Sequence, residues 1–96
     1  MIGQKWKILA KIYISNNHIE NIDILSDYIA LEIIDASNCQ ISYVNLKLKQ
    51  LRKLNLSGNH IQEWPSLLKS NKLEYLNLNN NVIPEIFNED KDILYA

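Results

Sequence analysis

The sequence predicts an α/β solenoid, in which short parallel strands stack on one another and are joined by tight 3₁₀-like or irregular returns. Three observations lead to this fold class: an internal repeat, an alternation of apolar and polar residues early in each repeat, and a later spacing of three between apolar residues. The chain has 96 residues, of which 47% are hydrophobic and 22% charged, as in a folded globular protein. We therefore expect a single domain over residues 1–96.

Four segments of the chain superpose on one pattern. Successive segments begin 22, 20 and 22 residues apart. The first, fourth, sixth, eleventh and fourteenth residues of the pattern are apolar in all four segments, which is far more regular than a chain of 47% hydrophobic residues gives by chance. The repeat is flanked by residues 1–8, a partial N-terminal cap, and residues 87–96, a C-terminal tail or cap. The segments begin at Leu9, Leu31, Leu51 and Leu73.

The spacing within each repeat predicts its local structure. The alternation in Leu76-Asn77-Leu78 has period two, so both leucines point to one side of a short strand. The later apolar residues, such as Ile19 and Ile22, are three apart, which suits a tight 3₁₀-like or irregular return. A single coil of this kind cannot bury its apolar face, so the coils must stack.

The ninth residue of each repeat forms a second, polar pattern. A side-chain amide carries two donors and one acceptor, so it can satisfy backbone groups where the chain turns away from the strand. We expect these side chains to stack inside the coils as a structural rung. The cysteine is smaller and a weaker donor, so its rung should be less well satisfied. The rung residues are Asn17, Cys39, Asn59 and Asn81.

Together the two patterns spell Leu51-x-x-Leu54-x-Leu56-x-x-Asn59-x-Ile61, which resembles the L-x-x-L-x-L-x-x-N/C-x-L signature of the leucine-rich-repeat family. The resemblance covers residues 9–86. The 22-residue period is similar to that of the phosphatase-regulatory class of these proteins. The resemblance implies a horseshoe segment of about four repeats, with strands on the concave face and the irregular returns on the convex side.

The outward positions of the strands supply the candidate binding residues. In leucine-rich repeats the concave sheet face is the usual binding surface, and exposed aromatic side chains are typical anchors for a partner. By this resemblance the partner-binding candidates are Tyr13, Ile33, Asp35, Lys53 and Tyr75.

We therefore expect a non-catalytic protein–protein interaction module, acting as an adaptor, a scaffold or a regulatory subunit. The chain contains only two glycines, so it has no phosphate-cradling loop, and no cofactor is expected. His18 and His60 fall on turns two strands apart, about 9–10 Å at the usual strand spacing, which is too far to share a metal ion. No catalytic residue and no metal site are predicted.

Two other readings of the sequence stay open. The chain could be a component of a ribonucleoprotein particle, although its net charge is −1 and acidic residues interrupt the one basic stripe. It could also be a fragment of a longer leucine-rich-repeat protein. The stripe contains Lys5, Lys7, Lys11, Lys47, Lys49, Arg52 and Lys53, and the interrupting residues are Glu32, Asp35 and Glu74.

The ends of the predicted solenoid look uncapped. Trp6 continues the three-residue rhythm and is expected to lie over the first coil, whereas Glu89 and Asp92 break the rhythm after Ile86. Open ends expose unpaired strand edges, so homo-oligomerisation through them is a second expectation.

Cysteine content and hydropathy predict the compartment. Cys39 is the only cysteine, so no disulfide can form within the chain, as is usual in a reducing environment. There is no secretory signal pattern and no run of apolar residues long enough to span a membrane. We expect an intracellular protein, cytoplasmic or nuclear, that binds another protein rather than nucleic acid or a membrane.

Overall fold

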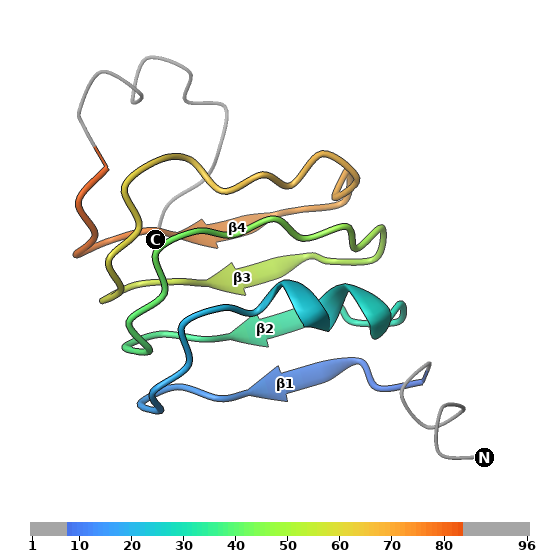
Figure 1. Cartoon of the computed structure of the whole chain (residues 1–96). Helices are drawn as coiled ribbons and strands as arrows, with labels where there is room; N and C mark the ends of the chain where they lie inside the picture. The colour runs from blue at the N-terminus through green and yellow to red at the C-terminus, as the bar shows by residue number, and fades with distance from the viewer. Residues whose placement is uncertain (1–7, 84–96) are drawn as a thin grey trace.

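The computed structural model describes residues 8–83 of the chain. Four short strands pair in chain order into one parallel sheet (Figure 1). The return between the first two strands contains a 3₁₀ helix, η1 (Asp23–Asp27), whereas the two later returns, residues 36–52 and 56–74, contain no helix. The strands are β1 (Lys11–Tyr13), β2 (Ile33–Asp35), β3 (Lys53–Asn55) and β4 (Tyr75–Asn77).

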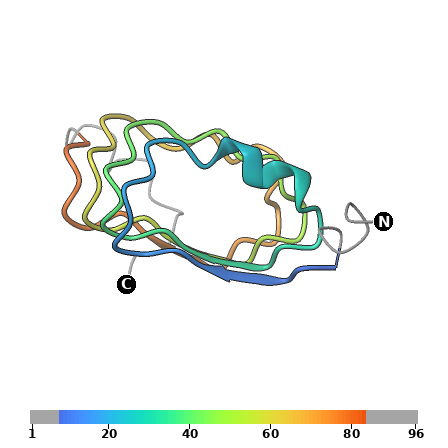
Figure 2. The ribbon, with the colours of Figure 1, turned by 60° about the horizontal axis from the view of Figure 1, so that its bottom comes forward.

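The strands and the returns form the two sides of a stack of coils. In Figure 2 the strands lie over one another along one side, and the returns with η1 lie along the opposite side. Three residues per strand are too few to hold a free sheet, so each coil depends on the apolar interior that it shares with its neighbours. The repeated sequence and the parallel sheet fit a repeat solenoid.

The core consists of the apolar positions of the repeat. Residues of the inner coils, such as Leu31, Leu51 and Leu54, are completely buried, whereas Leu9 and Ile12 of the first coil are only half-buried. This gradient follows from stacking, because an inner coil is covered on both sides and an outer coil on one. Ile86 and the charged residues Glu89 and Asp92, like Trp6 at the other end, lie outside the described residues.

The outward-facing residues of the four strands form two columns. Because the strands pair without offset, equivalent residues of successive repeats face each other across the sheet. One outer column contains Lys11, Ile33, Lys53 and Tyr75. The central outer column contains Tyr13, Asp35, Asn55 and Asn77.

The first return confirms the three-residue rhythm. The amide of Leu25 donates to the carbonyl of Ile22 at 2.9 Å, that of Tyr28 to Leu25 at 2.9 Å, and that of Leu31 to Tyr28 at 3.0 Å. Each bond spans three residues, as in a 3₁₀ helix. The rhythm therefore brings the apolar side chains Ile22, Leu25 and Leu31 into the core together.

Candidate functional site

The candidate site is the outer face of the four-stranded sheet. The register brings all five predicted binding residues to this face. Tyr13 is on the edge strand β1 and Tyr75 on the edge strand β4. The strands between them carry Ile33, Asp35 and Lys53. Tyr13 on β1 is 64% exposed and Lys53 on β3 is exposed, whereas Ile33, Asp35 and Tyr75 are half-buried. The face thus offers two aromatic rings, one at each edge, with mixed charges between.

Tyr75 is held along its own strand. Its phenolic oxygen lies 3.4 Å from Nδ2 of Asn77, which donates to it. The two side chains point the same way because they are two residues apart on a strand. This contact uses the phenolic oxygen as an acceptor, and it leaves the phenolic hydrogen able to donate to another group.

Asp35 has an internal role besides the predicted one. Its Oδ1 accepts hydrogen bonds from the backbone amide of Ser37 at 3.1 Å and from its hydroxyl at 2.8 Å. Asn55 holds Ser57 in the same way, at 3.0 and 2.8 Å. These are Asx turns, which end the strand by supplying an acceptor two residues before the turn. The central column therefore shapes the turns as well as the surface.

The next polar column forms the turn itself. All four of its residues have a positive φ, between 55° and 69°. Glycine adopts this left-handed conformation freely and asparagine tolerates it better than most residues, which explains the residue types. The recurrence of Asn or Gly at one repeat position is the sequence signal for this left-handed turn. The column contains Asn16, Asn38, Gly58 and Asn80.

Asn59 is the best-satisfied rung of the stack. Its Oδ1 accepts from the backbone amides of Cys39 at 2.8 Å and Ile41 at 3.0 Å, and its Nδ2 donates to the carbonyls of Ala36 and Leu56 at 3.0 and 2.8 Å. Asn59 is 3% exposed. One side chain thus ties two coils together.

The other rungs are less uniform. Asn81 repeats the pattern, accepting from Ile61 at 2.9 Å and donating to Leu56 at 2.8 Å. The side chain of the completely buried Cys39 donates through its sulfur, which lies 3.2 Å from the carbonyl oxygen of Ile14 and 3.3 Å from that of Ser37.

Asn17 corrects the prediction of a rung inside the coils. The side chain is exposed and donates only to carbonyls of its own coil, those of Ile14 at 3.0 Å and Ser15 at 3.1 Å. The rung bonds of Asn59 and Asn81 reach back to the preceding coil, whereas Asn17 belongs to the first coil that the structure describes. Its Oδ1 therefore has no preceding coil among the described residues to bind.

An ion-pair ladder crosses the coils just before the strands. Arg52 Nε lies 3.4 Å from Oε1 of Glu32, and Nη1 lies 3.5 Å from Oε1 of Glu74. The one arginine among the described residues is thereby flanked by two carboxylates, so it adds little attraction for a phosphate backbone. This weakens the basic stripe expected of a ribonucleoprotein component, of which Lys5 and Lys7 lie outside the described residues.

The histidines and carboxylates do not gather into a metal centre in the part of the chain that the structure describes. His18 Nε2 lies 3.0 Å from Oε2 of Glu20, and both side chains are largely exposed. Over residues 8–83, no three His, Cys, Asp or Glu side chains lie close enough to hold a metal ion. The same residues contain no helix with the length and hydropathy needed to cross a membrane.

Comparison with known proteins supports the repeat. Residues 49–90 match the family described as Leucine Rich repeats (2 copies). No curated protein and no solved structure matches the chain. The matched segment contains β3 and β4 with the Asn59 and Asn81 rungs, and the same pairing continues to β2 and β1. The match and the continuous parallel sheet together support a leucine-rich repeat protein.

Proposed function

We propose that this protein is a non-catalytic interaction module that binds a partner protein through the outer face of its sheet. Leucine-rich repeats generally mediate protein–protein interaction, and they generally contribute no catalysis. The observation that carries the proposal is the exposed Tyr13, 64% accessible on a face that also bears Tyr75. A stacked solenoid needs no aromatic side chain at an outward strand position, whereas a binding surface uses one as an anchor.

The role and the place of the protein are part of the proposal. A face with two aromatic anchors and no catalytic side-chain arrangement suits an adaptor, scaffold or regulatory subunit, and the 22-residue period favours the phosphatase-regulatory class. We take the sheet as the concave side of a short horseshoe. The buried, unpaired thiol of Cys39 supports an intracellular location, cytoplasmic or nuclear.

The experiment is a comparison of three variants in affinity capture from the native cell. Tyr13→Ala and Tyr75→Ala remove the sheet-face anchors, and Tyr43→Ala is the matched control, since Tyr43 is 58% exposed on the return between β2 and β3. We expect one protein to be retained in stoichiometric amount by the wild type and by Tyr43→Ala. Tyr13→Ala should lose it, with a smaller loss for Tyr75→Ala. A partner that survives both sheet-face substitutions, or is lost equally from the control, contradicts the proposal.

A further inference from the structure

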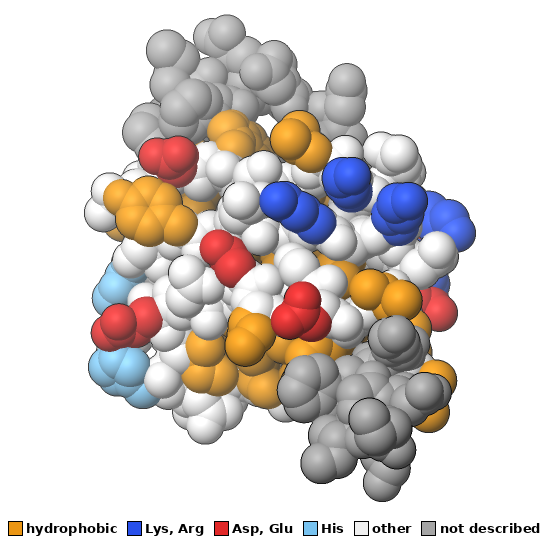
Figure 3. Space-filling view, turned by 45° about the vertical axis from the view of Figure 1, so that its right-hand side comes forward, with side chains coloured by type: hydrophobic (Ala, Val, Ile, Leu, Met, Phe, Trp, Pro, Cys, Tyr) orange, Lys and Arg blue, Asp and Glu red, His pale blue; other side chains and the backbone are white. Residues whose placement is uncertain are grey.

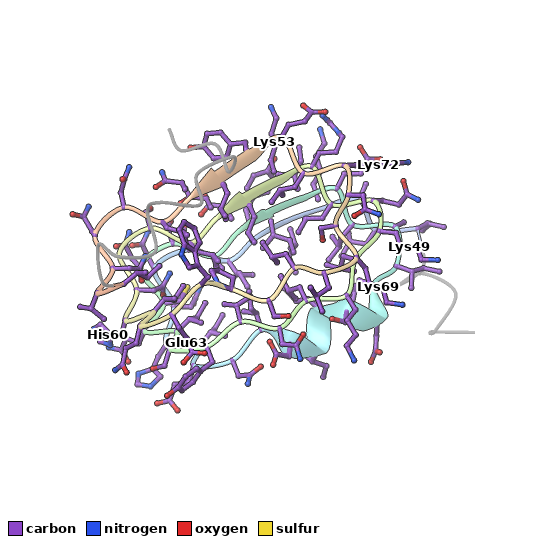
Figure 4. All side chains as sticks on the ribbon, turned by 90° about the horizontal axis from the view of Figure 1, so that it is seen from above. Lys49, Lys53, His60, Glu63, Lys69 and Lys72 are labelled. Carbon is purple, nitrogen blue, oxygen red and sulfur yellow. The ribbon has the colours of Figure 1, made fainter. Side chains whose placement is uncertain are left out.

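A second surface lies away from the sheet, at the turns that precede the strands. Two adjoining hollows there share Lys49, Gln50 and Lys69 in their walls, so they form one groove. Figure 3 shows Lys and Arg side chains gathered on this part of the surface. In Figure 4 the labelled Lys49, Lys69 and Lys72 lie at one end of the coils, opposite His60 and Glu63. We call this surface the lysine groove; its walls are Ile29, Lys47, Lys49, Gln50, Leu68, Lys69, Asn71 and Lys72.

The charge of the lysine groove is uncompensated among the residues that form it. Four of the eight wall residues are lysines and none is acidic. Lys47 and Lys69 stand at equivalent places, four residues before Leu51 and Leu73, so the stacking of coils sets like charges in one column. Like charges on neighbouring coils repel, and an anionic ligand relieves that repulsion. Within the groove, Nζ of Lys72 donates a hydrogen bond to Oε1 of Gln50 at 2.7 Å, which orients the Lys72 side chain.

The walls of the lysine groove also include exposed apolar side chains. Leu68 is 86% exposed and Ile29 is 57% exposed, whereas Leu46, Leu48 and Leu51 nearby in the chain are completely buried. A ligand that matches the groove therefore needs apolar groups as well as negative charge. An acidic polypeptide segment with a large aliphatic side chain supplies both.

We infer that the lysine groove is a docking site for an acidic segment of a partner protein, in which carboxylates face Lys47, Lys49, Lys69 and Lys72 and an aliphatic side chain packs on Leu68. A nucleic acid fits less well, because no wall residue is aromatic and able to stack on a base, and because the whole chain carries a net charge of −1. This site is separate from the sheet face and does not rest on the proposed function.

The test is direct binding by fluorescence anisotropy at low and at moderate salt. The probe is a short labelled peptide of Asp and Glu residues with one central leucine. Its comparison probes are the same peptide with Asn and Gln for the acids, the same peptide with serine for the leucine, and a single-stranded oligouridylate. The groove variants are Lys49→Glu with Lys69→Glu, and Leu68→Ser. The control is Lys11→Glu, which reverses an exposed lysine on β1, outside the groove.

We expect the acidic peptide to bind more tightly than all three comparison probes, and to lose affinity as salt rises. The double lysine reversal should weaken it by about tenfold or more, Leu68→Ser by about threefold, and Lys11→Glu by less than about twofold. Equal binding of the neutral peptide, tighter binding of the oligouridylate, or an equal loss in Lys11→Glu overturns the inference. Because the groove variants change none of the predicted sheet-face binding residues, failure here is distinguishable from failure of the partner capture by Tyr13 and Tyr75.

Discussion

The side-chain oxygen of Asn59 accepts a 2.8 Å hydrogen bond from the backbone amide of Cys39, which lies twenty residues earlier in the chain. The bond joins two successive coils inside the core, where neither group can reach water. A side chain that satisfies the backbone of the coil before it makes the stacking of coils depend on the ninth repeat position. The effect of the rung substitutions on the free energy of unfolding follows from this arrangement.

Replacing Asn59 with alanine should therefore be the most damaging of the rung substitutions. It leaves the buried amides of Cys39 and Ile41 without an acceptor, and we expect a loss of about 3 kcal/mol or more in the free energy of unfolding. Asn17→Ala is the matched control, because Asn17 is exposed, and should cost less than about 1 kcal/mol. Urea denaturation followed by circular dichroism measures both. Equal losses would show that the rung does not hold the coils together.

The left-handed turn column predicts an asymmetry between glycine and asparagine. Gly58 has a φ of +69°, and an added Cβ would lie 2.0 Å from Oδ1 of Asn38, so that side chain must move. We expect Gly58→Ala to lower the free energy of unfolding by about 1–2 kcal/mol. Asn80→Gly, at φ 60°, should change it by less than about 0.5 kcal/mol. Thermal or urea unfolding of the two variants measures both changes. A Gly58→Ala variant with the free energy of unfolding of the wild type would contradict the turn geometry.

The thiol of Cys39 should report on unfolding. It has no exposed surface in the folded protein, so a thiol reagent reaches it only when the coils separate. We expect labelling of the native protein to be at least about a hundredfold slower than labelling of the urea-unfolded chain. Asn59→Ala should speed the native reaction, since it loosens the adjoining rung. Rapid native labelling would place Cys39 at the surface instead.

The Arg52 ladder should add little stability, and that little should depend on salt. The three side chains are between 35% and 60% exposed, so solvent screens both ion pairs. We expect Arg52→Gln to cost about 1 kcal/mol or less at low ionic strength, and nearly nothing in molar salt. Unfolding curves at the two salt concentrations test this. A loss that is independent of salt would mean that Arg52 acts by packing.

The sequence was sufficient to predict which residues face each other. Once the repeat is aligned, Ile34, Leu54 and Leu76 occupy one position, and stacking without offset makes them neighbours. The two outward columns, one with Tyr13 and the other with Tyr75, follow from the alternation of side chains on a strand. Repetition and period two carry enough information for this, with no need of tertiary detail.

The sequence was insufficient where one side chain serves two purposes or where several turns meet. Asp35 looked like surface because it alternates outward, and its bonds to Ser37 depend on the turn that follows. The lysine groove depends on how Lys47 and Lys69 line one hollow together with Ile29 of another coil, although their 22-residue separation was visible in the sequence. The interior position expected of Asn17 failed because an end coil lacks the neighbour that the repeat pattern assumes.

The most direct measurement is a methyl NOESY spectrum combined with amide hydrogen exchange in solution. Parallel stacking in this register predicts contacts from Ile34 to Leu54 and from Leu54 to Leu76, with no contact from Ile34 to Leu76. It also predicts slow exchange at the amides of Ala36 and Leu56, which donate to carbonyls of the next coil at 2.9 Å. A spectrum that lacks both contacts, with rapid exchange at these two amides, would contradict the stacked solenoid and the binding face built on it.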